Sequence, residues 1–211
     1  MARRSIRAFR SDPVDDATIR SLLEAAARAP SGGNLQPWRI YVINGSTMPA
    51  LQAHLGERDF EAPGYDIYPP GLIEPYRTNR FAVGEQMYAL LDIGRDDKGA
   101  RLARLAENYS FFGAPCGLFC FVDRIMGPPQ WSDLGMFLQT FMLLAQEEGL
   151  DTCAQEAWAT RSAAVGEFVG APDEWMLFCG MAIGRRDPDA AVNTLVSERQ
   201  PVDDWATFVG N

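Results

Sequence analysis

The stretch Pro30-Ser31-Gly32-Gly33-Asn34-Leu35-Gln36-Pro37-Trp38 joins a predicted helix to a predicted strand. Gly32 and Gly33 have no β-carbon, so the main chain there can approach a ligand closely. The amides of Asn34 and Gln36 can read a ring that carries both hydrogen-bond donors and acceptors. The stretch therefore fits a flat, polar ligand, although an ordinary loop between a helix and a strand is the alternative.

A second segment, Arg3-Arg4-Ser5-Ile6-Arg7-Ala8-Phe9, places three guanidinium groups and a hydroxyl within five residues. In an extended chain alternate side chains point the same way, so Arg3, Ser5 and Arg7 can converge on one ligand while Arg4 faces elsewhere. Guanidinium groups bind phosphate through bidentate, charge-assisted hydrogen bonds. The segment suits a phosphorylated ligand, and a solvated basic amino terminus is the alternative.

The elements around these segments mix helices and strands without strict alternation, which favours an α+β fold. Asp15 is predicted to cap a helix that runs to about Ala29. Ser132 or Asp133 is predicted to cap a helix over residues 134–148. That helix is apolar nearly all round, which predicts a buried position and a subunit interface. Strands are predicted at residues 38–43, 116–122 and 175–184, and further helices at residues 46–55, 84–93, 98–108 and 161–169.

Residues 56–81 show no periodicity and contain four prolines. An irregular segment of this length inside a compact domain is usually functional or mobile. We predict that it gates the face on which a substrate binds, with Tyr65, Tyr68, Arg77 and Arg80 as the candidate substrate contacts. A segment that wraps a second subunit without a chemical role is the alternative.

Two later segments add candidate residues. Small residues flank Gln155 and Glu156 in the segment 149–158, so its main chain can contact a planar ligand, and a plain loop with one carboxylate is the alternative. The predicted strand at 175–184 ends in glycine and is followed by Arg185 and Arg186, which can bring a second cation to a phosphate. Surface charges are the alternative for these two arginines, and Asn193 and Arg199 follow them in the chain.

The composition excludes several classes of function. A net charge of −9 argues against a nucleic-acid partner. The four cysteines include no C-x-x-C pair and are predicted to be buried free thiols of a cytoplasmic protein. His54 is the only histidine and is predicted to lie at the surface, so neither a histidine-rich metal site nor a Ser-His-Asp mechanism is expected. We expect no signal peptide, because no apolar region follows the basic first residues, and no membrane helix, because no apolar run is long enough.

In this order and spacing, the segments resemble those of the FMN-dependent nitroreductase family, in its branch of small bacterial nitroaromatic and nitrobenzoate reductases. The stretch 127–135 strengthens the resemblance, which extends from Arg3 to about Arg199. It implies one nitroreductase-like FMN-binding domain over residues 1–211, with residues 56–81 as a gating loop or excursion. The implied fold is a central, mostly antiparallel sheet flanked by helices in an interwoven homodimer, with FMN at the dimer interface.

The resemblance also assigns expected roles to positions. Arg3, Ser5 and Arg199 would meet the phosphate and ribityl chain, and Arg7 the N1–C2 edge of the flavin. The backbone N–H of Ala157 would face N5, where relatives often have glycine. The implied cofactor-binding residues are Arg3, Arg4, Ser5, Arg7, Pro30, Ser31, Gly32, Asn34, Asn108, Gln155, Glu156, Ala157 and Arg199.

The implied activity is reduction of nitroaromatic compounds, such as nitrobenzoate, by NADPH or NADH through FMN in a ping-pong reaction. The cofactor carries the hydride chemistry and the protein binds, orients and tunes it, so no catalytic side chain is assigned. Reduction of enones, halogenated aromatics or free flavins is an alternative with the same cofactor. An FMN-binding protein without turnover, or a structural subunit, is the alternative outside enzymes.

Overall fold

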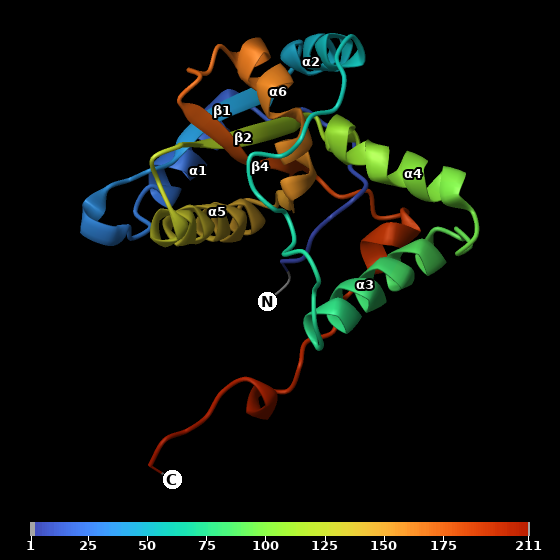
Figure 1. Ribbon diagram of the computed structural model, residues 1–211. Helices are drawn as coiled ribbons and strands as arrows, with labels where there is room; N and C mark the ends of the chain where they lie inside the picture. The colour runs from blue at the N-terminus through green and yellow to red at the C-terminus, as the bar shows by residue number, and fades with distance from the viewer. Residues whose placement is uncertain (1–2, 211) are drawn as a thin grey trace.

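The computed structural model describes residues 3–210 and contains one sheet with helices on both of its faces (Figure 1). Short 3-10 helices connect several of the longer elements. The helices and strands are α1 (Asp16–Ala26), β1 (Arg39–Asn44), α2 (Thr47–Gly56), α3 (Tyr76–Leu90), α4 (Lys98–Ala106), β2 (Cys116–Asp123), α5 (Pro128–Glu147), β3 (Asp151–Gln155), α6 (Ser162–Val169) and β4 (Trp175–Gly184).

The sheet has the order β1-β2-β4-β3, and every pair of neighbouring strands is antiparallel. This confirms the predicted fold class and the strands at 38–43, 116–122 and 175–184. The prediction missed β3. This strand lies within the segment 149–158, for which no strand was predicted. β3 is a short strand that begins with Asp151 and ends with Gln155, so it lacks the apolar run by which the other strands are recognised.

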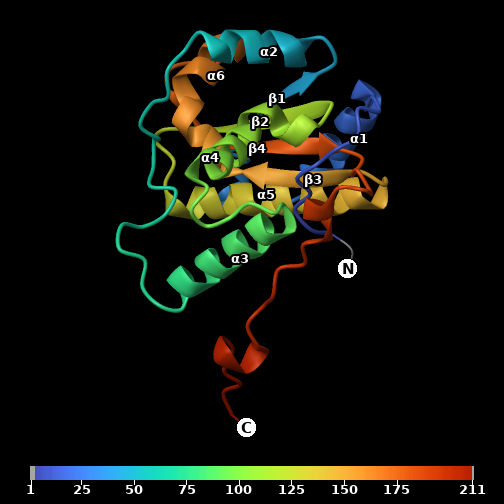
Figure 2. The ribbon, with the colours of Figure 1, turned by 90° about the vertical axis from the view of Figure 1, so that its right-hand side faces the viewer.

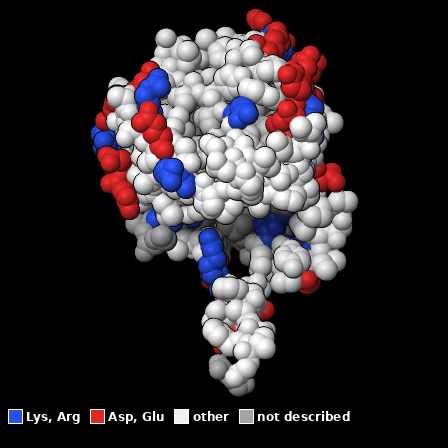
Figure 3. Space-filling model, turned by 90° about the vertical axis from the view of Figure 1, so that its left-hand side faces the viewer, with Lys and Arg blue, Asp and Glu red and all other residues white. Residues whose placement is uncertain are grey.

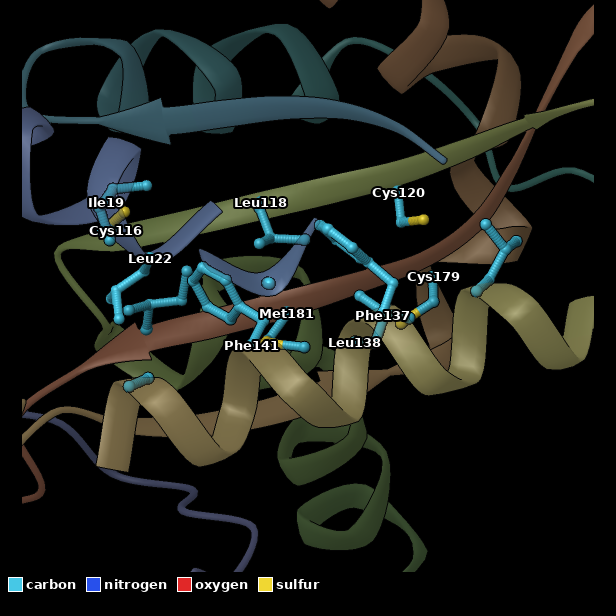
Figure 4. Packing of buried hydrophobic residues seen from close by; sticks show 14 of the residues in the cluster. Ile19, Leu22, Cys116, Leu118, Cys120, Phe137, Leu138, Phe141, Cys179 and Met181 are labelled. Atoms are coloured by element: carbon cyan, nitrogen blue, oxygen red, sulfur yellow. The ribbon is translucent and has the colours of Figure 1, made fainter. Parts of the chain in front are cut away.

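Helices α1 and α5 cover one face of the sheet, and α2 and α6 cover the other (Figures 1 and 2). The apolar stripe of α5 packs between α1 and the residues of β2 and β4 that point to its side, as Figure 4 shows. The stripe consists of Leu134, Phe137, Leu138, Phe141 and Ala145, all of them buried. The predicted buried position is therefore confirmed for the face that the rest of this chain covers, while Met136 on the opposite side of α5 is 39% exposed.

Helix α5 begins six residues earlier than predicted, at Pro128, with Gly127 as its N-cap. The predicted caps Ser132 and Asp133 lie inside the helix, so that prediction was wrong. Proline fits the first turn of a helix because its missing N–H would have no intrahelical partner there. The first turns of α5 lie ahead of the stripe, so periodicity did not reveal them.

Helix α3 begins at Tyr76, so the irregular segment ends at residue 75 and not at 81. The predicted helix at 84–93 is this helix displaced toward the carboxyl terminus. None of the residues of α3 is buried, so no apolar stripe marked its beginning. As a consequence, Arg77 and Arg80 lie on the first turns of a helix, while Tyr65 and Tyr68 lie in the irregular segment.

The four cysteines are buried and free, as predicted. The surface interpretation of His54 was wrong, because its side chain is only 16% exposed. Its Nε2 lies 2.8 Å from the carbonyl oxygen of Ala164, which joins α2 to α6 across the outer helical layer. Among residues 3–210 no helix is long and apolar enough to cross a membrane.

Candidate functional site

The amino-terminal segment is held in an extended form along the open edge of β3. Ser5 forms an isolated parallel bridge with Thr152, and the Ile6 N–H donates to the Thr152 carbonyl at 3.1 Å. Farther along, the Arg10 N–H donates to the Arg185 carbonyl at 2.9 Å. Ile6 is fully buried, so it anchors the segment while its polar neighbours remain at the surface of the protein.

Arg3, Arg4, Ser5, Arg7 and Arg199 line one cavity of about 130 Å³. Figure 3 shows basic side chains around the hollow from which the carboxyl-terminal segment leaves the body of the molecule. Arg4 lines the cavity together with Arg3 and Arg7. The prediction that Arg4 faces elsewhere, which assumed strict alternation of side chains along an extended segment, was therefore wrong. The remaining lining comes from α3 and from the segment before Arg199, at Val83, Leu195, Val196 and Ser197.

The charge in this cavity is not balanced by the described part of the protein. Within residues 3–210, Arg3, Arg4, Arg7 and Arg199 form no salt bridge, and Arg4 Nε is buried without a hydrogen-bond partner. A chain of net charge −9 has ample carboxylates to neutralise four guanidinium groups. Their convergence without carboxylates fits an anion with several acceptor oxygens, such as the phosphate of FMN.

A second, larger cavity of about 550 Å³ lies between α3 and α4 and shares Arg7 with the first. It brings together Tyr68, Arg77, Arg80 and Asn108 from the predicted set. The Arg80 guanidinium lies 4.0 Å from the centre of the Tyr68 ring and forms no salt bridge within the described residues. Arg77 pairs with Glu74 at 2.6 Å. The structure thus places an aromatic ring, and a cation that the described residues leave unpaired, in a cavity that Arg7 also lines.

The carboxyl end of β3 carries Gln155, Glu156 and Ala157. The Gln155 side chain is buried and its Nε2 donates to the carbonyl and side-chain oxygens of Asn108, at 2.8 and 3.2 Å. Desolvation raises the pKa of the Glu156 carboxyl, although part of its side chain is exposed. The Ala157 carbonyl accepts from the Thr160 hydroxyl at 2.8 Å. The two bonds from Gln155 fix the end of β3 to the turn that contains Asn108.

The stretch 30–38 does not line either cavity. Both carboxylate oxygens of Asp133 on α5 accept from the Gly32 N–H, at 3.3 and 3.2 Å, and Ser31 Oγ accepts from the Gln36 N–H at 3.0 Å. Pro30, Gly32 and Asn34 are exposed. Within one chain the structure therefore holds this loop in a defined shape but away from the arginines.

Tyr65 also lies outside both cavities. Its phenol donates to the Phe178 carbonyl, and its ring packs against Trp131 and Phe178 at centroid distances of 5.8 and 5.9 Å. Burial raises the pKa of the Tyr65 phenol. In this structure Tyr65 fastens the irregular segment to the sheet and to α5.

Sequence reasoning missed the contribution of Arg104 and left Asn193 without a role. Arg104 lines the larger cavity and donates to the Arg7 carbonyl, although an arginine on a polar helix face gives no signal of burial. Asn193 is buried and bonded to the backbone of the amino-terminal segment. Its position after a buried strand was the only signal available.

Known proteins are similar to this chain over nearly all of its length. The model of the Nitroreductase family matches residues 1–185. A 4-nitrobenzoate reductase of Pseudomonas putida is 36% identical over 211 residues, which cover 99% of this chain and 93% of the relative. The crystal structure of the FMN- and NADPH-dependent nitroreductase NfnB from Sphigopyxis sp. strain HMH is similar with a TM-score of 0.93 and 47% identity, covering 100% of this chain and 96% of that chain.

A further solved structure is the FMN-dependent nitroreductase NfnB of Mycobacterium smegmatis in complex with NADPH, at a TM-score of 0.89 and 30% identity over 98% of this chain and 94% of that chain. The family model, the relative and the solved structures all indicate the same family. The chain belongs to the nitroreductase family.

Proposed function

We propose that this protein is an FMN-dependent NAD(P)H oxidoreductase that reduces nitroaromatic compounds, built as one FMN-binding domain over residues 1–211. The single observation that carries the proposal is the cavity in which four arginines and Ser5 converge without a carboxylate. The names of the similar proteins supply the reaction, since they include a 4-nitrobenzoate reductase and FMN- and NADPH-dependent nitroreductases. The free cysteines fit a reducing compartment such as the cytoplasm.

In this proposal, Arg3, Arg4, Ser5 and Arg199 bind the phosphate of FMN. Arg7 lines both cavities, so its guanidinium can also face the flavin edge or a substrate. Asn108, Gln155, Glu156 and Ala157 orient the flavin ring from the end of β3. FMN supplies the hydride transfer, from the nicotinamide of NAD(P)H to the nitro group. The part of the chain that the structure describes holds no cluster of metal-ligating side chains.

We also propose that the protein is a homodimer. Met136, on the face of α5 away from the sheet, is 39% exposed, and the carboxyl-terminal segment extends from the body (Figure 1) with exposed apolar side chains that include Trp205 and Phe208. A second copy would cover these surfaces and bring the loop 30–34 to the flavin.

Light scattering should give twice the chain mass of 23.3 kDa, and a monomer that binds FMN with full affinity would contradict the proposal.

The test of the proposed function follows the absorbance of the purified protein under anaerobic conditions. We expect a flavin spectrum that one equivalent of NADPH bleaches and that 4-nitrobenzoate restores afterwards. Two separate half-reactions, one after the other, are characteristic of a ping-pong reaction. Bleaching without recovery would leave the enzyme class but refute nitroaromatic reduction, and a colourless protein after reconstitution with FMN would refute the proposal.

Replacing Arg80 with glutamine is expected to raise KM for 4-nitrobenzoate about 10-fold, because a charge-assisted hydrogen bond contributes roughly 1.5 kcal/mol. The reason is that Arg80 has no carboxylate partner in the described chain and faces a cavity beside the Tyr68 ring. KM for nitrobenzene, which lacks a carboxylate, should stay near that of the unmodified protein. Steady-state kinetics with both substrates measures the difference.

Arg77 provides the matched control for this prediction. It lines the same cavity on the same helix, but its guanidinium is already paired with Glu74. Arg77→Gln should therefore change KM for 4-nitrobenzoate less than Arg80→Gln does. Equal changes of KM for nitrobenzoate and nitrobenzene in Arg80→Gln would show that Arg80 does not bind the carboxylate of the substrate.

A further inference from the structure

Asn193 is a buried amide that joins the amino-terminal segment to the chain beyond β4. Its Oδ1 accepts from the Arg7 N–H at 2.9 Å, and its Nδ2 donates to the carbonyls of Ala8 and Asp187, at 2.8 and 2.9 Å. Three of the four hydrogen bonds that an asparagine amide can make are therefore used. All three go to the main chain, and two of them go to adjacent residues of the arginine segment.

Arg104 holds the other side of the same residue. Its Nη2 donates to the Arg7 carbonyl at 2.9 Å, its Nη1 pairs with Glu107, and its guanidinium lies 5.0 Å from the centre of the Phe112 ring. The N–H and the carbonyl of Arg7 are thus bound by side chains of two elements distant in sequence. In the described chain no strand of the sheet binds the N–H or the carbonyl of Arg7 itself, whereas the neighbouring Ile6 N–H and Ala8 carbonyl bond to the main chain of Thr152 and Asp187.

We call these two side chains, Asn193 and Arg104, the Arg7 clamp. Holding the backbone of Arg7 matters because the cavity brings like charges together. Four guanidinium groups repel one another unless an anion is bound, and they would spread apart if the segment were free to move. A site that is held in its binding geometry before the ligand arrives loses less conformational entropy on binding. The residues that hold the backbone of Arg7 therefore influence how tightly the cavity can bind an anion.

We infer that Asn193 is the positioning residue of the arginine-lined cavity, holding the Arg7 backbone so that the guanidinium groups meet the FMN phosphate together. Arg104 is the second half of this clamp. Neither side chain needs to touch the cofactor, since the effect passes through the main chain of residues 7 and 8. The inference rests on the proposed binding of FMN. It adds that the affinity gained from the phosphate group, which distinguishes FMN from riboflavin, depends on Asn193.

The experiment compares the affinity of the full-length protein for FMN and for riboflavin, which lacks the phosphate. In Asn193→Ala we expect the preference for FMN over riboflavin to fall about 10-fold, since both side-chain hydrogen bonds from Asn193 to the segment are lost. Riboflavin affinity should change little. Asn193→Ser, which keeps a hydroxyl able to make one of the bonds, should show a smaller fall in the same direction and serves if the alanine variant does not fold.

Asn44 is the matched control. Its Oδ1 accepts from the Gly45 N–H at 2.9 Å, and its Nδ2 donates to the Val14 carbonyl and to Asp16, at 2.7 and 2.8 Å. Like Asn193 it makes three hydrogen bonds, although one of them goes to a carboxylate, and it lies outside the lining of both cavities. Asn44→Ala should lower the thermal unfolding midpoint but leave the preference for FMN over riboflavin unchanged.

The two proposals fail in different ways. If both Asn193 variants weaken FMN and riboflavin by the same factor, or retain the wild-type preference, the positioning role of Asn193 is refuted while FMN binding stands. If the unmodified protein itself does not prefer FMN over riboflavin, the phosphate site and the proposed function fail first. Thermal unfolding of the flavin-free proteins separates a loss of stability from a loss of phosphate binding.

Discussion

Replacing both Arg3 and Arg7 with alanine is expected to lower the affinity for FMN by at least about 100-fold. Each hydrogen bond to a charged group contributes roughly 1.5–3 kcal/mol, and 1.4 kcal/mol corresponds to a factor of 10. Both guanidinium groups line the smaller cavity and neither forms a salt bridge within the described chain. The effect on binding therefore comes from lost contacts to FMN and not from a broken internal ion pair.

Fluorescence titration of the flavin-free protein measures this change, and the flavin content of the purified variant gives a second reading. Arg10→Ala is the matched control, because Arg10 lies in the same segment but pairs with Asp12 at 2.7 Å and does not line the cavity. We expect Arg10→Ala to retain its flavin. An Arg3→Ala/Arg7→Ala variant that purifies with the flavin content of the unmodified protein would refute the assignment of this cavity.

Replacing Gly180 with alanine is expected to destabilise the protein by about 3 kcal/mol, because overpacking of a close-packed core forces side chains and backbone to shift. A β-carbon at Gly180 would lie 2.2 Å from Cδ1 of Trp158, and that indole is completely buried. Trp158 follows directly on the segment 155–157, so its displacement also moves the end of β3. We expect a thermal unfolding midpoint roughly 10 °C lower, together with weaker flavin binding.

Gly166 on α6 is the control for this substitution. Its β-carbon would meet no atom within 4 Å, and the residue lies within a helix. Alanine there should leave stability unchanged or raise it by up to about 1 kcal/mol, because glycine loses more backbone entropy on folding. If Gly180→Ala unfolds at the same temperature as Gly166→Ala, the tight contact with Trp158 does not limit the packing.

The predictions from sequence were correct for elements whose buried residues form a recognisable apolar pattern. The strand β4 (Trp175–Gly184) was predicted with its observed ends, because a strand buried on both faces gives one continuous apolar run. The cap at Asp15 was also correct, since its side chain accepts from the Thr18 N–H at 2.8 Å. The beginnings of α3 and α5 were missed because their first turns are not buried, and β3 because it is short and polar at both ends.

The arginines of the candidate site were predicted for a different reason. Arg3, Ser5 and Arg7 are close in the chain and share a face of an extended segment, so local geometry alone brings them together. Arg199 was expected only from the family resemblance, and the structure brings it to the same cavity across nearly the whole length of the chain. The role of Arg4 in that cavity contradicted simple alternation, because a short edge segment need not keep ideal strand geometry.

By itself, the sequence determined the α+β class, the buried strands, the apolar face of α5 and the local cluster of basic residues. Each of these depends on residues a few positions apart, whose spacing matches the repeat of a helix or a strand. Only the tertiary structure decided that the Arg80 guanidinium lies over the Tyr68 ring, that Asn193 and Arg104 hold Arg7, and that Gly180 must have no side chain. These facts depend on contacts between residues far apart in the chain, and such contacts arise from three-dimensional packing that no local pattern records.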